Sequence, residues 1–182
     1  MSSGFHRSRK GASVRLDADE AAVLHGLFGQ LVELLGGGAE DHSGSDDPFR
    51  SLLAGMEPRE RPDDPALARL LPDAYADDAE ATNDFRRYTE GDLRQGKVDA
   101  ATTAQRSLGN GGRVDLSEEQ ARAWLRALND VRLTLGTRLE VTEDHERVFG
   151  ALDDDDPRKA LWYVYDWLSF LQQTLVEALM PE

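Results

Sequence analysis

The sequence contains no cysteine among its 182 residues. This absence excludes disulfide bonds, thiolate metal sites, iron–sulfur clusters and cysteine nucleophiles. Only the three methionines remain open to reversible oxidation, which is a weaker way to detect an oxidant. The chain therefore has no thiol of its own with which to respond to oxidative conditions.

Long hydrophobic runs are missing as well. No apolar stretch is long enough to span a bilayer, and the N-terminal MSSGFHRSRKG is polar and basic, unlike a signal peptide. Hydrophobic residues still make up 40% of the chain, which is enough for one sizeable core. The length corresponds to about one domain. We therefore expect a cytoplasmic protein with one folded domain.

Positive charge is scarce and unevenly placed. The formal net charge is −14, and the first fifteen residues hold four cations and no acid, so the rest of the chain carries −18. A body this acidic repels phosphate backbones and anionic membranes. We therefore expect protein partners, no membrane contact and no tight direct DNA binding by the isolated protein.

The four cations at the start define a basic N-terminal arm over residues 1–15, followed by a single domain over residues 16–182. Arg7, Arg9 and Lys10 are candidates for a weak contact with nucleic acid, as in other basic arms. The alternative is a solvated terminus. We favour this alternative because four charges supply only a weak, salt-sensitive contact.

The segments VRLDADEA and VDLSEEQA carry the same signal for the start of a helix. In each, a cap residue, Asp17 or Ser117, is followed three positions later by Glu20 or Gln120. This is the spacing of a capping box, in which each side chain bonds the backbone N–H of the other residue. Two helices should therefore begin near Asp17 and Ser117. The alternating Val-x-Leu lead-ins predict short strands, with Arg138–Val141 as a further pairing candidate.

Apolar spacing and further caps predict the remaining helices. Helices are expected up to Leu35, from Pro65 to Leu71, and over Asp78–Leu108, Trp124–Leu135, Glu143–Leu152 and Pro157–Leu179. A flexible connector is expected over residues 36–64, which begin with GGGAEDHSGSDDP. The predicted fold class is all-α, a single-domain helical bundle with at most a minor short β-hairpin.

The last predicted helix has apolar residues on two sides. A leucine stripe marks one side, and Trp162 and Phe170 flank Asp166 on the other. A helix that is apolar on both sides is either buried centrally or offers its second side to a partner. We expect Trp162, Asp166 and Phe170 to bind a partner or a second subunit, or to be covered by the helix around Phe85–Tyr88.

Arg132 falls within the apolar arc of the helix WLRALNDVRLTLGTRL. A buried guanidinium is costly unless an anion pairs with it. Asp130 is two residues away and points to another side of the helix. We therefore predict a structural ion pair with another helix. Asp166 is the first candidate for the partner, followed by Asp84 and Asp92.

Recognisable catalytic or metal-binding motifs are absent from the sequence. The four histidines are scattered, and none forms a His-x-x-x-His pair. Asp153–Asp156 lacks the alternation and central glycine of an EF-hand loop, and helix capping explains the run. The GNGG and GGG stretches lack the lysine and Ser/Thr of a phosphate loop, and no Gly-x-Ser-x-Gly elbow is present. We therefore predict a protein that is not an enzyme and uses no metal or cofactor.

Three segments carry a resemblance to a known family: DPALARLLPDAYADDAEATNDFRRYTEGDLR (Asp64–Arg94), WLRALNDVRLTLGTRLEV (Trp124–Val141) and YDWLSFLQQTLVEAL (Tyr165–Leu179). They resemble the actinobacterial oxidative-stress transcriptional regulator family, AosR-like proteins formerly catalogued as a domain of unknown function. The ALND-x-RL-x-LG-x-RL and YDWL stretches are the most specific parts. The resemblance covers nearly the whole chain apart from the connector.

The resemblance implies a regulator of transcription in oxidative stress that acts with RNA polymerase and a sigma factor on sulfur-assimilation genes. No catalytic residue carries over, and a thiol switch cannot operate in a chain without cysteine. The alternative function is an adaptor or scaffold that binds proteolysis or cysteine-biosynthesis machinery. An unrecognised hydrolase is a third candidate, and a homodimer is left open.

Overall fold

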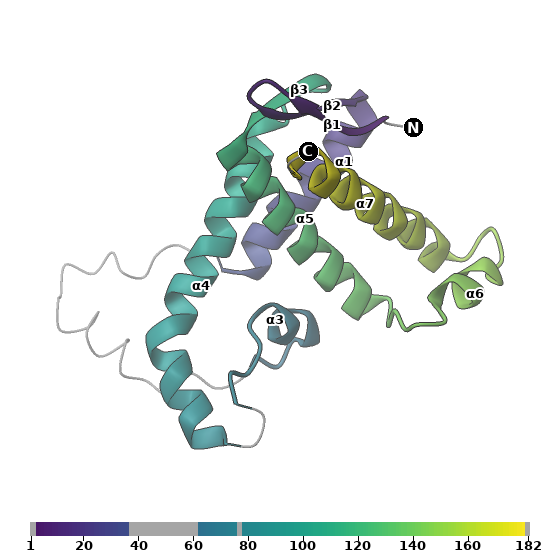
Figure 1. The fold of residues 1–182 in the computed structure, drawn as a ribbon. Helices are drawn as coiled ribbons and strands as arrows, with labels where there is room; N and C mark the ends of the chain where they lie inside the picture. Colours follow the sequence, from purple (N-terminus) through teal and green to yellow (C-terminus); the bar gives the residue numbers. More distant parts are fainter. Residues whose placement is uncertain (1–2, 37–61, 76–77, 181–182) are drawn as a thin grey trace.

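The computed structural model describes residues 3–36, 62–75 and 78–180 (Figure 1). Of the connector predicted over residues 36–64, residues 37–61 lie outside this described part. Within the described ranges, no helix combines the length and the apolar character that crossing a bilayer requires.

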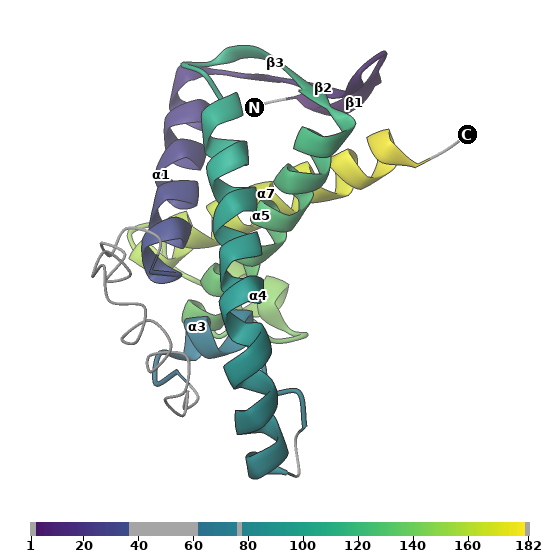
Figure 2. The ribbon, with the colours of Figure 1, turned by 90° about the vertical axis from the view of Figure 1, so that its left-hand side faces the viewer.

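A three-stranded antiparallel sheet forms one end of the molecule (Figures 1 and 2). Its strands, in sheet order, are β1 (Ser3–Ser8), β2 (Gly11–Leu16) and β3 (Gly112–Ser117). The prediction of an all-α fold is therefore wrong: the fold is mixed, though mostly helical. Each strand has six residues, and the two outer strands come from segments about a hundred positions apart, so the local Val-x-Leu patterns indicated two short strands but not a three-stranded sheet.

The two Val-x-Leu lead-ins pair with each other. Val14 of β2 lies directly opposite Val114 of β3, and both side chains point to the buried side of the sheet. Arg138, which the sequence offered as part of a third strand, is instead the last residue of a helix. The third strand is β1, from the segment predicted as a basic arm. Its alternating burial places Phe5 in the core.

All the helices lie on one side of the sheet (Figures 1 and 2). They are α1 (Ala18–Leu34), α3 (Pro65–Leu70), α4 (Ala79–Ser107), α5 (Glu118–Arg138), α6 (His145–Gly150) and α7 (Pro157–Leu179). The capping boxes predicted at Asp17 and Ser117 are confirmed, with both reciprocal hydrogen bonds present in each. These boxes start α1 and α5 directly after β2 and β3. Because the two strands are antiparallel, the two helices leave the sheet from opposite ends.

Helix α5 is central to the packing, and contacts α4, α7, α3 and α1. Its Trp124 is fully buried. The indole ring meets Phe5 of β1 and Phe28 of α1 edge to face, at centroid distances of 5.5 Å and 5.4 Å. Its Nε1–H donates to the Ser107 hydroxyl at the end of α4 at 2.6 Å. One side chain therefore connects four elements, and its single polar atom is satisfied.

Two buried charged groups hold the long helix α4 against its neighbours. Lys97 of α4 pairs with the buried Asp130 of α5 at 2.7 Å. Nearer the N-terminus of α4, the buried Arg86 pairs with Asp73 at 2.7 Å and with Glu90 at 3.1 Å. It also donates to the Leu71 carbonyl at 2.9 Å. Breaking a buried pair leaves an uncompensated charge, so these contacts strongly restrict how α4 packs.

Close approach of β1 to α7 depends on Gly4. A Cβ added there would lie only 2.5 Å from the Thr174 Cγ2 atom. This proximity lets the next residue, Phe5, donate its backbone N–H to the Thr174 hydroxyl at 3.0 Å. The absence of a side chain at Gly4 therefore fixes the distance between the sheet and the last helix.

Substitution of Gly4 by alanine should destabilise the fold by about 2 kcal/mol, because the added methyl group overpacks against Thr174. The matched control is Gly96→Ala in α4, where no atom lies within 4 Å of the new Cβ. This control should stabilise the protein by about 1 kcal/mol through helix propensity. Urea unfolding of the two variants measures both effects, and equal effects of the same sign would contradict the proposed contact.

Candidate partner-binding surface

The side of α7 that faces away from the core carries apolar side chains. Leu168, Leu171 and Leu175 point into the core and are fully buried. On the outward side, Tyr163 is 61% exposed and Phe170 is 44% exposed. The α7 surface is defined here as Trp162, Tyr163, Asp166 and Phe170. Sequence spacing predicted three of these residues, and the structure does place them on one side of the helix.

Helix α6 covers part of this surface. The ring of Phe149, which is buried, stacks on Trp162 with a centroid distance of 4.9 Å and an interplanar angle of 2°. His145 contacts the same indole at 5.0 Å, and Tyr165 stacks on it at 5.5 Å. Trp162 is therefore half-buried in an aromatic cluster, and its position is fixed before any partner arrives.

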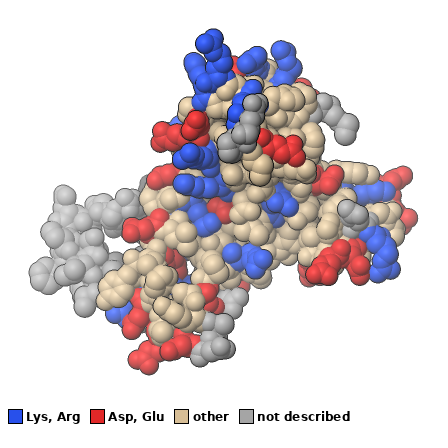
Figure 3. Space-filling model, in the orientation of Figure 1, with Lys and Arg blue, Asp and Glu red and all other residues tan. Residues whose placement is uncertain are grey.

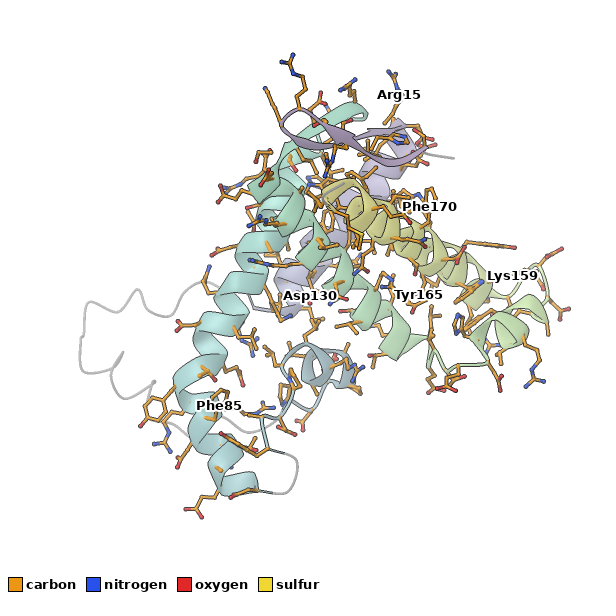
Figure 4. The ribbon with its side chains drawn as sticks, viewed as in Figure 1. Arg15, Phe85, Asp130, Lys159, Tyr165 and Phe170 are labelled. Carbon is orange, nitrogen blue, oxygen red and sulfur yellow. The ribbon has the colours of Figure 1, made fainter. Side chains whose placement is uncertain are left out.

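The helix around Phe85–Tyr88 does not cover the α7 surface. Phe85 lies on the far part of α4, well separated from Phe170 and Lys159 in Figure 4. Phe85 is itself 47% exposed, and Tyr88 is 75% exposed. Within the described part of the chain, Asp166 and Phe170 remain exposed. They are therefore available to a partner or to a second copy of the chain.

A hollow of about 370 Å³ opens beside Trp162, lined by Phe149, Lys159, Tyr163 and Asp166 among others. Aromatic walls with one cation and one anion at the rim suit an apolar side chain flanked by polar groups. A short helix was predicted over Glu143–Leu152, but the contact of Phe149 with Trp162 was not, because it depends on how α6 packs against α7. The only sequence signal for this contact was that Phe149 is the one Phe, Trp or Tyr residue of the segment HERVFG.

Two ion pairs at the N-terminus of α7 keep acidic side chains in their ionised form. The Lys159 ammonium donates to Asp154 at 2.6 Å, and this bond lowers the pKa of the Asp154 carboxyl below its ordinary value. The Arg158 guanidinium similarly lowers the pKa of Asp156, the residue that caps the helix. Both carboxylates are therefore ionised at neutral pH, next to the helix end that favours negative charge.

Arg132 reaches the last helix, but its partners there are neutral. Its Nε–H donates to the Ser169 hydroxyl at 2.8 Å, and Nη1 donates to the Gln172 side-chain oxygen at 2.5 Å. The guanidinium carbon lies 5.3 Å from the centroid of the Tyr165 ring. The side chain is half-buried.

The ion pair predicted between Arg132 and Asp166 is not among the salt bridges of the described residues. Tyr165, Ser169 and Gln172 are spaced so that they form one stripe of α7 facing α5. Asp166 follows Tyr165, and a step of about 100° along the helix turns its side chain away from that stripe. It points to solvent.

The basic residues of the N-terminus have diverse surroundings. Arg7 donates from Nε to the Ala178 carbonyl at 3.4 Å and from Nη2 to the Met180 carbonyl, so it caps the C-terminal end of α7. Arg9 and Lys10 are exposed at the turn between β1 and β2. Lys and Arg side chains project from this sheet end at the top of Figure 3, while acids and cations are interspersed elsewhere on that face.

Among the described residues, no three His, Asp or Glu side chains are grouped so as to hold a metal ion.

Comparison with known families identifies the chain. The profile of a family described as a domain of unknown function, DUF2017, matches residues 2–179. The chain belongs to the DUF2017 family. No solved structure matches it significantly.

Curated relatives confirm the family resemblance seen in the sequence. The oxidative stress regulator AosR of Mycobacterium tuberculosis (strain ATCC 25618 / H37Rv) is 35% identical over 180 residues, covering 88% of this chain and 78% of that protein. The putative oxidative stress regulator AosR of Mycobacterium leprae (strain TN) is 35% identical over 178 residues, covering 88% and 79% respectively. The sequence comparison therefore extends over most of both proteins.

Truncation of Arg132 to alanine should lower the free energy of unfolding by about 2 kcal/mol, because two charge-assisted hydrogen bonds and the contact with Tyr165 are lost. Arg126→Ala is the matched control, since Arg126 lies on the exposed side of the same helix. It should change stability by no more than about 0.5 kcal/mol. Thermal unfolding compares the two, and equally small losses would show that Arg132 does not hold α5 to α7.

Proposed function

We propose that this protein is a non-enzymatic regulator of transcription in oxidative stress, and that it acts in the cytoplasm through protein contacts with a sigma factor or RNA polymerase. The observation that carries the proposal is the α7 surface, on which Tyr163 and Phe170 are exposed beside the half-buried Trp162. Its relatives named as oxidative stress regulators supply the biological setting.

The α7 surface has the composition of a protein contact. Exposed aromatic side chains lose unfavourable contact with water when a partner covers them, and tyrosine and tryptophan are common among the residues that dominate binding energy. The stack with Phe149 already holds the Trp162 side chain in place, so binding a partner costs little additional conformational entropy at this residue. Asp166 and Lys159 at the edge of the aromatic residues supply charges that orient the partner.

The distribution of charge favours protein partners over DNA. Outside the first fifteen residues the chain carries −18, which repels a phosphate backbone. Of the cations near the sheet, Arg7 already bonds the end of α7, and Arg113 pairs with Asp115 at 2.9 Å. DNA-binding modules rely on many cations that are free to contact phosphate. The sheet end therefore supplies at most a weak, salt-sensitive contact.

Because the chain contains no cysteine, a thiol switch is excluded as the source of its response. With only three methionines left for reversible oxidation, a regulator built in this way receives the oxidative signal chiefly through a partner or through its own abundance. The absence of thiols therefore favours a role in binding over a role in sensing.

Replacement of both Tyr163 and Phe170 by alanine should weaken binding to sigma-bound RNA polymerase by tenfold or more, roughly the effect of losing two contact aromatics. Val23→Ala is the matched control, because Val23 is a comparably exposed apolar residue on α1. Its affinity should be unchanged. Surface plasmon resonance with immobilised polymerase holoenzyme measures both.

The same pair of variants tests the other occupants of the α7 surface. Loss of self-association in dilute solution would assign the surface to a homodimer. Capture of protease or cysteine-biosynthesis subunits, lost in the Tyr163 and Phe170 variant, would favour the adaptor function. Polymerase binding that is unaffected by the substitutions would contradict the proposed role of this surface.

The isolated protein should not bind promoter DNA at micromolar concentration, even at low salt, because its body repels phosphate. Fluorescence anisotropy of labelled promoter DNA, with and without sigma-bound polymerase, checks this expectation. An anisotropy change only when polymerase is present fits the proposal. Tight binding by the isolated protein that disappears at higher salt would show that the cations of the sheet end bind DNA directly.

A further inference from the structure

A second hollow, distinct from the α7 surface, surrounds Arg132. It has a volume of about 330 Å³ and is lined by residues of α5, by Arg69 of α3 and by Tyr165 of α7. Asn129 and Glu140 are also in its wall. The three sequence segments that carry the family resemblance each supply part of this lining. We call it the Arg132 hollow.

Arg132 differs from the other shielded cations of the protein. In the described residues, six Lys or Arg side chains are buried or half-buried, and all except Arg132 form an ion pair with a carboxylate. These five cations make six ion pairs: Arg86 with Asp73 and Glu90, Arg87 with Asp84, Arg94 with Glu90, Lys97 with Asp130, and Lys159 with Asp154. A shielded charge without a counter-charge is costly, so the exception calls for an anion from outside the described chain.

Neutral partners hold the Arg132 guanidinium in place without cancelling its charge. Ser169 and Gln172 accept from Nε and Nη1, and Tyr165 lies against the guanidinium. Gly136, one turn further along α5, permits this arrangement, since a Cβ there would lie 3.3 Å from the Tyr165 ring. The guanidinium offers several more N–H donors than these two bonds use, in a planar fork that matches an oxyanion.

The remaining walls favour an anion. Arg69, an exposed side chain of α3, adds a second cation, and none of the salt bridges of the described residues includes it. The Asn129 amide supplies further N–H donors. Thr137 contributes no hydroxyl donor, because its Oγ1 donates to the Leu133 carbonyl. Glu140 is the one carboxylate in the lining, so the cations outnumber the acids by two to one.

We propose that the Arg132 hollow binds a small oxyanion, a carboxylate or a phosphate, between Arg132 and Arg69. Arg132 binds two oxygens of the anion with its planar fork, and Arg69 supplies a second positive charge from α3. The source is either a free anion or an acidic side chain of a protein partner. The proposal does not depend on the function of the α7 surface.

Isothermal titration calorimetry of the full-length protein in a low-salt chloride buffer tests this site, with inorganic phosphate, succinate and a hexaglutamate peptide as probes. At least one probe should bind with a dissociation constant of about 1 mM or tighter. Binding of phosphate or succinate identifies a free anion as the source. Binding of the peptide alone identifies an acidic segment of a partner. Failure of all three probes to bind would overturn the proposal.

Variants distinguish a built site from general attraction to positive charge. Arg69→Gln leaves the packing of Arg132 intact, and it should weaken binding by about tenfold, as should Arg132→Lys, which keeps the charge and loses the planar fork. Glu140→Gln should tighten binding, because it removes the only carboxylate of the lining. Arg126→Gln, on an exposed side of α5 away from the hollow, should have no effect. Equal weakening in Arg126→Gln and Arg69→Gln, or none in Arg69→Gln and Arg132→Lys, would overturn the site.

Discussion

The burial of Trp124 is the constraint on which the rest of the structure depends. Its indole is too large to be covered by one element, so β1, α1 and α4 must all reach it, through Phe5, Phe28 and Ser107. The bond from Nε1 to Ser107 removes the cost of burying the one polar atom. Once Trp124 is covered, the rotation of α5 about its axis is fixed. Every other side chain of α5 then has an assigned direction.

That rotation determines where both candidate sites lie. Asp130 is directed towards α4, where it pairs with Lys97, and Arg132 is directed towards α7, where it meets Ser169 and Gln172. Because α7 presents one stripe to α5 and its leucines to the core, its remaining side is left in contact with solvent. The Arg132 hollow and the α7 surface are thus two consequences of the same packing. One arises between the helices, and the other on the side of α7 that α6 covers only in part.

The predictions that succeeded concern interactions among neighbouring residues. The capping boxes at Asp17 and Ser117 depend on hydrogen bonds across three residues, and Pro157 begins α7 as its sequence indicates. The grouping of Trp162, Asp166 and Phe170 on one side of α7 follows from helical periodicity alone. The two Val-x-Leu strands were predicted, but their pairing with each other was missed because they come from distant segments, and a basic, polar stretch gave no sign that β1 would join them and place Phe5 in the core.

Composition and local spacing determined that this protein has no thiol chemistry and where most of its helices begin, and the match of the whole sequence to a family model showed the family to which it belongs. These properties depend on residue types and on bonds between near neighbours. The tertiary structure decided that Arg7 caps a helix end and that Arg132 contacts Ser169 and Gln172 and not Asp166. The reason is geometric: a difference of one residue along α7 turns a side chain by about 100°, and only the packing of α7 against α5 selects which direction faces the arginine.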